Sequence, residues 1–201
     1  MTRLIAPIVL EGRHVMLEPL DAAHETELRA AASDGELWKL WYTSVPTRDG
    51  MRAWIDTALD QRDRLGAMPF VVRRVQDGVV GPVVGSTRMF NVDETYRRLE
   101  IGHTWYAQSV QRTAVNTECK LLLLAHAFEQ LRCIAVEFRT HWMNHQSRAA
   151  IARLGAKQDG VLRNHQVMPD GSLRDTVVFS IIASEWPTVK RHLHYRLEMP
   201  R

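Results

Sequence analysis

The fold of this chain is decided by the stretch WYAQSVQRTAVNTECKLLLL, which spans residues 105–124. It begins as a β-rich segment, crosses a polar turn from Gln111 to Thr117, and ends as an apolar run with helical character. The first turn of a helix leaves backbone N–H groups without partners, and the helix dipole adds positive potential there. A strand that stops at such a turn and restarts as a helix therefore predicts a site for phosphate groups.

Length and charge indicate a single folded domain that spans residues 1–201. The 201 residues suffice for one sizeable core, and 45% hydrophobic with 24% charged residues is typical of globular chains. The formal net charge is only +3, and the basic residues are dispersed. No nucleic-acid partner is expected, because such a surface needs denser basic charge with interleaved aromatic rings. A small basic nucleic-acid-binding domain is accordingly the weakest of the alternatives.

Cysteine usage and hydropathy favour the cytoplasm. Cys119 and Cys133 lie inside apolar segments, so we expect two small buried hydrophobic residues rather than a disulfide. The apolar run from Leu4 to Leu10 is interrupted by Pro7, and no later segment is long enough to cross a bilayer. We expect no membrane partner. The sequence leaves the oligomeric state open, a homodimer included.

The order of the predicted elements indicates the fold class. Strands are expected at 15–20, 70–75, 83–90, 99–106, 134–140, 160–165 and 176–182, and helices at about 23–32, 51–65, 118–131 and 144–154. The segment 99–140 forms one strand-helix-strand unit, whose strands pair in parallel. The other neighbours read as hairpins. The sequence thus predicts an α/β protein of the α+β type, with a mixed, largely antiparallel central sheet and helices on both faces. The tail around residues 192–196 is expected to be loosely held.

These elements and their residues resemble the GNAT superfamily of acyl-CoA-dependent N-acetyltransferases, and the branch that acetylates the N-termini of ribosomal proteins looks closest. The resemblance rests on motifs in a common order, namely 17–20 (LEPL), 84–88 (VGSTR), 100–105 (EIGHTW), 116–120 (NTECK), 144–148 (NHQSR), 160–163 (GVLR) and 184–187 (SEWP). It implies the acyl-CoA N-acyltransferase fold. It also implies acetyl-CoA as cosubstrate and transfer of the acetyl group to a primary amine, in a peptide N-terminus or a small molecule.

The polar turn matches the family's phosphate-binding pattern only in part. Gln111 fits the first position, but Ala114 and Asn116 stand where glycine and a small residue are expected. Alanine replaces glycine only where φ is negative. The resemblance assigns cofactor binding to Trp105, Gln111, Arg112, Thr113, Ala114, Val115, Asn116, Thr117, Lys120, Asn144 and Ser147. Without that resemblance, the turn reads as a capped helix start with polar surface residues.

Glu100 matches the family's strand glutamate that serves in some members as general base. An ammonium group cannot attack a thioester until it loses its proton, and a buried carboxylate with a raised pKa removes it effectively. Strand alternation places Glu100, Gly102 and Thr104 on one face, with Leu99, Ile101, His103 and Trp105 on the other. His103 rivals Glu100 as base only if a bulge rotates it into the cleft. The alternative for Glu100 is a salt-bridged strand carboxylate.

A second catalytic position follows from the resemblance near Asn144. Many family members carry a tyrosine seven residues beyond this asparagine, which protonates the leaving thiolate, but this chain has Ile151 there. The closest branch has a serine three residues after the asparagine, which matches Ser147. Ser147 is therefore the candidate for thiolate protonation, while Asn144 and Ser147 also suit a helix cap.

The acceptor cleft is the least determined part. Its candidate residues are Trp38, Trp41, Tyr42, His103 and His165. No metal is expected, because His141 and His145 lack a third ligand. A second class of function stays open, a catalytically weak or inactive protein of the same fold that binds or senses acyl-CoA, since the glycine and the tyrosine are absent.

Overall fold

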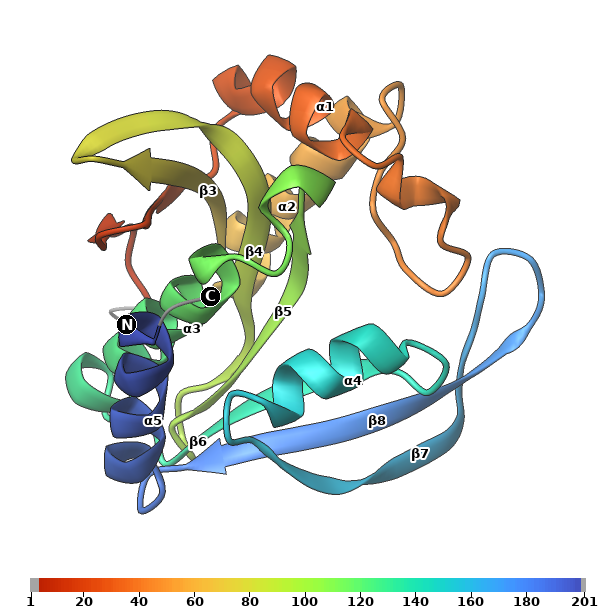
Figure 1. Cartoon of the computed structure of the whole chain (residues 1–201). Coiled ribbons are helices and arrows are strands. Elements are labelled where there is room, and N and C mark those ends of the chain that lie inside the picture. The colour runs from red at the N-terminus through yellow and green to blue at the C-terminus, as the bar shows by residue number, and fades with distance from the viewer. Residues whose placement is uncertain (1–3, 200–201) are drawn as a thin grey trace.

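The computed structural model describes residues 4–199 (Figure 1). Its strands are β1 Leu10–Glu11, β2 Val15–Pro19, β3 Met68–Gln76, β4 Val79–Asp93, β5 Arg98–Tyr106, β6 Ala135–His141, β7 Lys157–Val167 and β8 Leu173–Ile182. Its α-helices are α1 Glu25–Ser33, α2 Met51–Leu65, α3 Ala114–Ala125, α4 His145–Ala152 and α5 Trp186–Glu198. Short 3-10 turns cover Ala22–His24, Leu37–Lys39 and Gln108–Val110, and a π-helical turn, His126–Gln130, extends α3.

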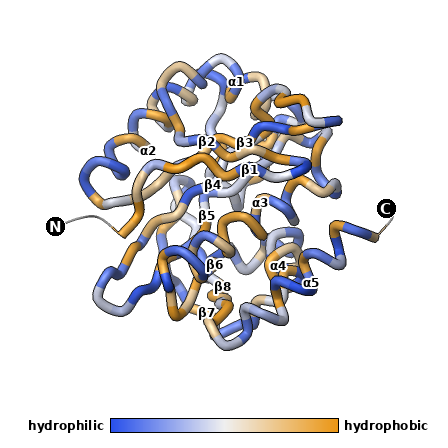
Figure 2. The backbone as a smooth tube through the Cα atoms, turned by 90° about the vertical axis from the view of Figure 1, so that its left-hand side faces the viewer, coloured by the Kyte–Doolittle hydropathy of each residue, from blue (hydrophilic) through white to orange (hydrophobic). Residues whose placement is uncertain are grey.

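All eight strands form one sheet in the order β1-β2-β3-β4-β5-β6-β8-β7. Every neighbouring pair is antiparallel except β5 and β6, which α3 connects. Figure 2 shows the strands in one column, with α2 on one side and α3, α4 and α5 on the other. This arrangement confirms the predicted mixed, largely antiparallel sheet with helices on both faces.

The parallel pair is short, and its end opens the sheet. β5 and β6 pair only at Arg98, Leu99 and Glu100, opposite residues 135–137. Beyond Glu100 the two strands diverge, so that the sheet opens as a V between β4–β5 and β6–β8 (Figure 1). The backbone N–H and C=O groups at this edge of β5 lose their neighbouring strand. An extended ligand can pair there as an added strand does.

A β-bulge follows the split on β5. Ser86 of β4 faces Trp105 and Arg88 faces Gly102, so one residue of β4 lies opposite two of β5. His103 within the bulge has a φ of 49°. Beyond the bulge, the side chains of β5 point to the opposite faces of the sheet from those that strict alternation predicts. Trp105, for example, contacts Trp54 of α2 with ring centroids 6.1 Å apart.

Two side-chain assignments change as a result. Thr104 points to α3, where its Oγ1 lies 2.7 Å from Nζ of Lys120. The predicted grouping of Thr104 with Glu100, and of Trp105 with Ile101, was therefore wrong, because strict alternation ends at a bulge.

The predicted loose tail was also wrong. Residues 186–198 form α5, which packs on α3. The Trp186 ring stacks on Phe128 with centroids 5.3 Å apart, and Val189 and Leu193 are buried. Lys190 Nζ lies 2.7 Å from Oε1 of Glu129. These contacts with the π-helical turn hold α5 in place. They cannot be predicted from the tail sequence alone, because their partners lie more than fifty residues away.

The core fills both faces of the sheet and includes the two cysteines. Cys119 and Cys133 are buried and unpaired, as predicted. Burial raises the pKa of the Cys119 thiol and raises that of Cys133 to about 11, so neither forms a thiolate readily. Within residues 4–199, no helix has the length and apolar character needed to cross a membrane.

Candidate functional site

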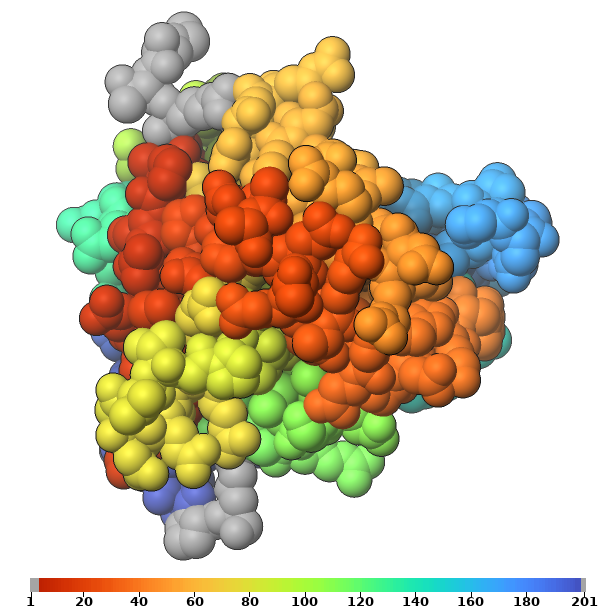
Figure 3. Space-filling view, turned by 90° about the horizontal axis from the view of Figure 1, so that it is seen from above, coloured from red at the N-terminus to blue at the C-terminus, as the bar shows by residue number. Residues whose placement is uncertain are grey.

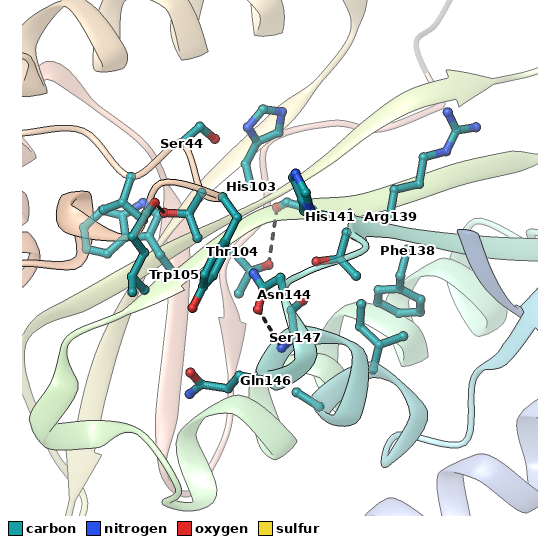
Figure 4. Close-up of a pocket in the computed structure, with 18 of the residues that line it drawn as sticks. Ser44, His103, Thr104, Trp105, Phe138, Arg139, His141, Asn144, Gln146 and Ser147 are labelled. Carbon is teal, nitrogen blue, oxygen red and sulfur yellow. Dashed lines mark hydrogen bonds between the residues drawn. The ribbon is translucent and has the colours of Figure 1, made fainter. Parts of the chain in front are cut away.

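A cavity of about 770 Å³ opens at the split between β5 and β6. Its walls come from the ends of β5 and β6, the starts of α3 and α4, the segment 37–45, the β7–β8 hairpin, and side chains of α2 and β4. Figure 4 shows residues of β5, β6 and α4 around this opening. Figure 3 shows the β7–β8 hairpin, in blue, projecting beside the orange segment between α1 and α2. The cavity therefore joins a helix N-terminus to the split edge of the sheet.

The turn before α3 has the conformation that leaves donors free. Its left-handed residue is Arg112, with a φ of 62°, whereas Ala114 and Asn116 lie inside the helix with negative φ. Alanine is therefore compatible with its position. Thr113 is the N-cap, and its Oγ1 accepts from the N–H of Val115 at 3.3 Å. Among residues 4–199 the N–H groups of Ala114 and Asn116 find no hydrogen-bond acceptor. Such a helix start suits an anion.

The residues predicted for cofactor binding divide into two groups. Those that line the cavity are Trp105, Gln111, Arg112, Thr113, Asn116, Lys120, Asn144 and Ser147. Ala114, Val115 and Thr117 do not line it, and Val115 and Thr117 are buried against the core side of α3. Gln111 links the turn to its surroundings, because its Nε2 donates to the Tyr106 carbonyl at 3.1 Å and its Oε1 accepts from Gln146 at 3.2 Å. Any role of Ala114, Val115 and Thr117 is thus confined to their backbone.

Lys120 points into the sheet rather than toward the turn. Its Nζ donates to Oγ1 of Thr104 at 2.7 Å and to Oγ1 of Thr87 at 3.1 Å, and the side chain is 5% exposed. Burial lowers the pKa of Lys120 to about 8. No carboxylate of the described chain lies within 4.0 Å of this ammonium group. Its charge is therefore held by two hydroxyl groups beneath the cavity.

Glu100 lies at the point of the split and is 6% exposed. Its Oε2 accepts from Nδ2 of Asn91 at 3.0 Å and lies 3.5 Å from Nε of Arg139. Burial raises the pKa of the Glu100 carboxyl, although Asn91 and Arg139 act in the opposite direction. A carboxyl with a raised pKa in a cleft is suited to proton transfer near neutral pH.

His103 lies on the Glu100 side of the sheet because of the bulge. Its ring contacts Phe90, the residue paired opposite Glu100, with centroids 4.8 Å apart. The His103 side chain lines the cavity and is exposed there. Protein atoms surround the rest of the ring. Burial, together with the charges of Arg88 and Arg174, lowers the pKa of His103 to about 4. The bulge thus rotates His103 toward the cleft, which was the condition for His103 to rival Glu100 as general base. With this lowered pKa, the His103 ring is neutral at pH 7.

Asn144 and Ser147 lie where α4 begins. Asn144 is the N-cap, and its Oδ1 accepts from the N–H of Ser147 at 2.9 Å (Figure 4). The Ser147 hydroxyl lines the cavity and has no hydrogen-bond partner within residues 4–199. Ile151, in place of the family's tyrosine, is buried. The cap and a hydroxyl directed to the cavity therefore coexist.

The predicted acceptor residues also divide. Tyr42, His103 and His165 line the cavity. Trp41 does not line the cavity, but its ring contacts His141 edge-on with centroids 5.1 Å apart. Trp38 packs against the hydrophobic core and does not line the cavity.

Sequence reasoning missed two arginines beside Glu100. Arg139 of β6 and Arg174 of β8 both line the cavity, and both influence the Glu100 carboxyl. Their distance in sequence hides this proximity, which the β6–β8 register creates. The alternation of charged residues along 135–141 was the available signal. In the part of the chain that the structure describes, no group of three His, Cys, Asp or Glu side chains is arranged to hold a metal ion.

Comparison with known proteins gives consistent matches. Residues 14–157 match the sequence profile of the acetyltransferase (GNAT) domain. YdaF of Bacillus subtilis (strain 168), provisionally named a ribosomal N-acetyltransferase, is 29% identical over 106 residues, which cover 53% of this chain and only 57% of that protein. A solved GCN5-related N-acetyltransferase from Brucella melitensis is 32% identical, with a TM-score of 0.85 over 96% of this chain and 86% of that chain.

A more distant structure, Mycobacterium smegmatis RimJ in complex with CoA-disulfide, has a TM-score of 0.74 and 22% identity, over 94% of this chain and 95% of that chain. At this identity the likeness shows the fold alone.

Proposed function

The chain belongs to the GNAT acetyltransferase family, and on this premise we propose that it transfers an acetyl group from acetyl-CoA to a primary amine by direct attack. One observation carries the proposal: the split between β5 and β6 begins at Glu100 and opens onto the N-terminus of α3. A helix start that suits a phosphate and a buried carboxylate thus lie in one cavity. The acceptor is a peptide N-terminus or a small-molecule amine, and the reaction belongs to the cytoplasm.

The residues of the turn fit the phosphate part of coenzyme A. The free N–H groups of Ala114 and Asn116 and the positive end of α3 favour a diphosphate, and Arg112 adds a charge at the same end. The acetyl thioester would supply an activated carbonyl group. Beyond Glu100, the unpaired edge of β5 offers backbone groups for the extended arm.

Glu100 would act as the general base. The acceptor amine is protonated in solution, and Glu100 takes one of its protons directly or through one water. The amine nitrogen then bonds to the acetyl carbon as the carbon–sulfur bond breaks. Backbone N–H groups at the freed edge of β5 would stabilise the negative charge that develops on the carbonyl oxygen. Holding both substrates in one cavity supplies much of the rate enhancement.

Ser147 would return a proton to the leaving thiolate. Its hydroxyl lines the cavity, and its backbone N–H is fixed by Asn144. No tyrosine stands at the position of Ile151. That replacement favours one alternative, a protein that binds or senses acyl-CoA with weak or no turnover.

One experiment separates the two functions. Release of free thiol from acetyl-CoA is measured against panels of peptides and small amines, and binding of coenzyme A is measured by calorimetry. Transferase activity predicts amine-dependent thiol release. Saturable binding without release on any amine would support the sensing alternative, and the absence of both would refute the proposed function.

A further inference from the structure

Arg174 of β8 is a half-buried cation that forms no salt bridge within residues 4–199, and the Glu100 carboxylate acts on its charge from a longer distance. Its Nε donates to Oγ1 of Thr176 at 3.0 Å, and no carboxylate within residues 4–199 lies within 4.0 Å of its guanidinium group. It lines the cavity and acts electrostatically on three other lining residues, Glu100, His103 and His141. Arg174 therefore faces the space in front of Glu100.

Thr176 fixes the orientation of Arg174. Arginine only donates hydrogen bonds, so the Thr176 hydroxyl oxygen accepts from Nε. The Thr176 hydroxyl then donates its proton in a hydrogen bond to Nδ1 of His165, which lies 3.1 Å away. With Nε tied, the two terminal amino groups of the guanidinium remain for another partner. They form the planar fork that matches a carboxylate.

His141 adds a second donor beside this fork. It is paired with Thr176 across β6 and β8, and paired residues point to the same face of a sheet. Its Nδ1 accepts from the backbone N–H of Met143 at 3.0 Å, so the proton of the neutral ring is on Nε2. His141 is only 4% exposed, and Nε2 is buried without a hydrogen-bond partner. His141 lines the cavity beside the Trp41 ring, and its Nε2–H group is a fixed donor without a hydrogen-bond acceptor in the described structure.

The neighbouring carboxylates are already engaged elsewhere. Asp175 is bound by Nε of Arg163 at 2.5 Å and by the backbone N–H of Asn164 at 2.7 Å. Glu137 is shared by Arg98, at 2.5 Å, and Arg139, at 3.0 Å. A half-buried cation and a buried unpaired donor are both costly unless a ligand satisfies them.

We propose that the amine acceptor also carries a carboxylate, which the Arg174 guanidinium and the Nε2–H group of His141 bind while the amine lies at Glu100. This inference rests on the proposed function and names its substrate class, an amino acid or a peptide that begins with an acidic residue. The ammonium and carboxylate groups of such an acceptor match the opposite charges of Glu100 and Arg174. An amine without the carboxylate leaves Arg174 and His141 unsatisfied.

The test compares acceptors that differ only in the carboxylate. Free α-amino acids are measured against their carboxamides, and peptides beginning with Asp against those beginning with Asn, by thiol release. The carboxamides hold more of their amine in the free-base form at pH 7, so chemical reactivity alone favours the neutral member of that pair. We expect kcat/KM to be at least tenfold higher for the carboxylate member in at least one pair. The pair that responds identifies the source of the carboxylate.

Variants then assign the preference. Arg174→Gln is expected to raise KM for the carboxylate acceptor by about 10- to 100-fold, so that its advantage over the neutral acceptor is lost. Arg174→Lys should be intermediate, because it keeps the charge but loses the fork. His141→Phe should act in the same direction as Arg174→Gln. Arg148→Gln on α4, outside the cavity lining, is the matched control.

Equal use of both members of every pair, or a preference that survives Arg174→Gln, would overturn the inference while leaving the acetyl transfer intact. If no amine releases thiol, the proposed function fails, and binding decides the inference. Calorimetry of the CoA-saturated protein then compares an N-acetyl amino acid with its carboxamide. Tighter binding of the carboxylate supports the inference, and equal or absent binding rejects it.

Discussion

The Oε2 atom of Glu100 lies 3.5 Å from the Nε atom of Arg139, across the point at which β5 and β6 part. Asn91 donates to the same oxygen. The other oxygen, Oε1, has no hydrogen-bond partner among the residues that the structure describes, and it lies on the side of Gly102. One oxygen therefore holds the carboxyl in place, and the other is free to take a proton.

Glu100→Gln should abolish most of the turnover. The substitution keeps the shape of the side chain but removes the proton acceptor, and general base catalysis contributes about 10²- to 10⁴-fold. We expect kcat to fall within that range while the calorimetric affinity for coenzyme A stays unchanged. Turnover at the wild-type rate would remove Glu100 from the mechanism and leave His103 as the candidate base.

The pH dependence of kcat/KM should reflect the ionisation of the Glu100 carboxyl. Burial raises the pKa of Glu100 above 4.5, and only the ionised form accepts a proton, so kcat/KM should rise with pH through that raised pKa. Arg139 lowers the pKa of Glu100, and Arg139→Gln should therefore move this limb to higher pH. A limb that stays in place or moves to lower pH in the variant contradicts the assignment.

Ser147→Ala should slow the reaction without loosening the fold. The hydroxyl has no partner in the described structure, whereas the backbone N–H of Ser147 keeps its bond to Asn144. We expect kcat to fall about tenfold or more, as for loss of a general acid, with the melting temperature nearly unchanged. Asn144→Ala is the contrasting variant, because it removes the cap and should cost about 1 kcal/mol of stability. A Ser147→Ala enzyme with full kcat would leave thiolate protonation to water.

Ala114→Asp should separate phosphate binding from helix stability. A carboxylate in the first turn of α3 favours the helix dipole, so the free energy of unfolding should not fall. The same charge repels a diphosphate, and the dissociation constant of coenzyme A should rise about tenfold or more. Ala114→Ser is the neutral control. Undiminished affinity in the aspartate variant would place the phosphates elsewhere.

Lys120→Met should stabilise the protein at neutral pH. The ammonium group is buried with its pKa lowered to about 8, which corresponds to a cost of about 3 kcal/mol at most relative to an unfolded value of 10.5. The Thr87 and Thr104 hydroxyl groups lie 2.8 Å apart and can pair without it.

The sign of the pH dependence follows from the same shift. Between about pH 8 and 10.5 the unfolded chain binds the proton that the folded one has lost, so wild-type stability rises with pH and the rise is absent in Lys120→Met. Urea titrations at pH 7 and pH 10 measure both effects. A less stable variant at pH 7 would mean that the lysine contributes more through its hydrogen bonds than burial costs.

The sequence predicted correctly those helices and turns that depend on residues close to one another in the chain. The helix expected at about 51–65 is α2, in which Met51, Ile55 and Ala58 are buried. The polar turn before the apolar run predicted the strand-turn-helix at 105–124. The family resemblance that these elements carried is confirmed by the profile match over residues 14–157.

Positions set by distant contacts were not accessible in this way. A positive φ at His103 is no local preference of histidine, and the bulge that produces it depends on pairing with β4. The helix at 186–198 depends on Phe128 and Glu129, more than fifty residues away. Arg174 and His141 meet only because β8 pairs with β6 in one register.

The family resemblance alone pointed to Glu100 as the candidate base. The sequence pattern by itself determined the order of helices and strands between residues 15 and 182, and the helix start that suits a phosphate. These depend on periodicity and backbone hydrogen bonding within a few residues. Only the tertiary structure decided where β5 and β6 part, which face His103 and Thr104 occupy, and which cations surround Glu100. The physical reason is that strand register and bulges are fixed by packing between distant segments, and a one-residue change in either reverses the direction of every side chain that follows.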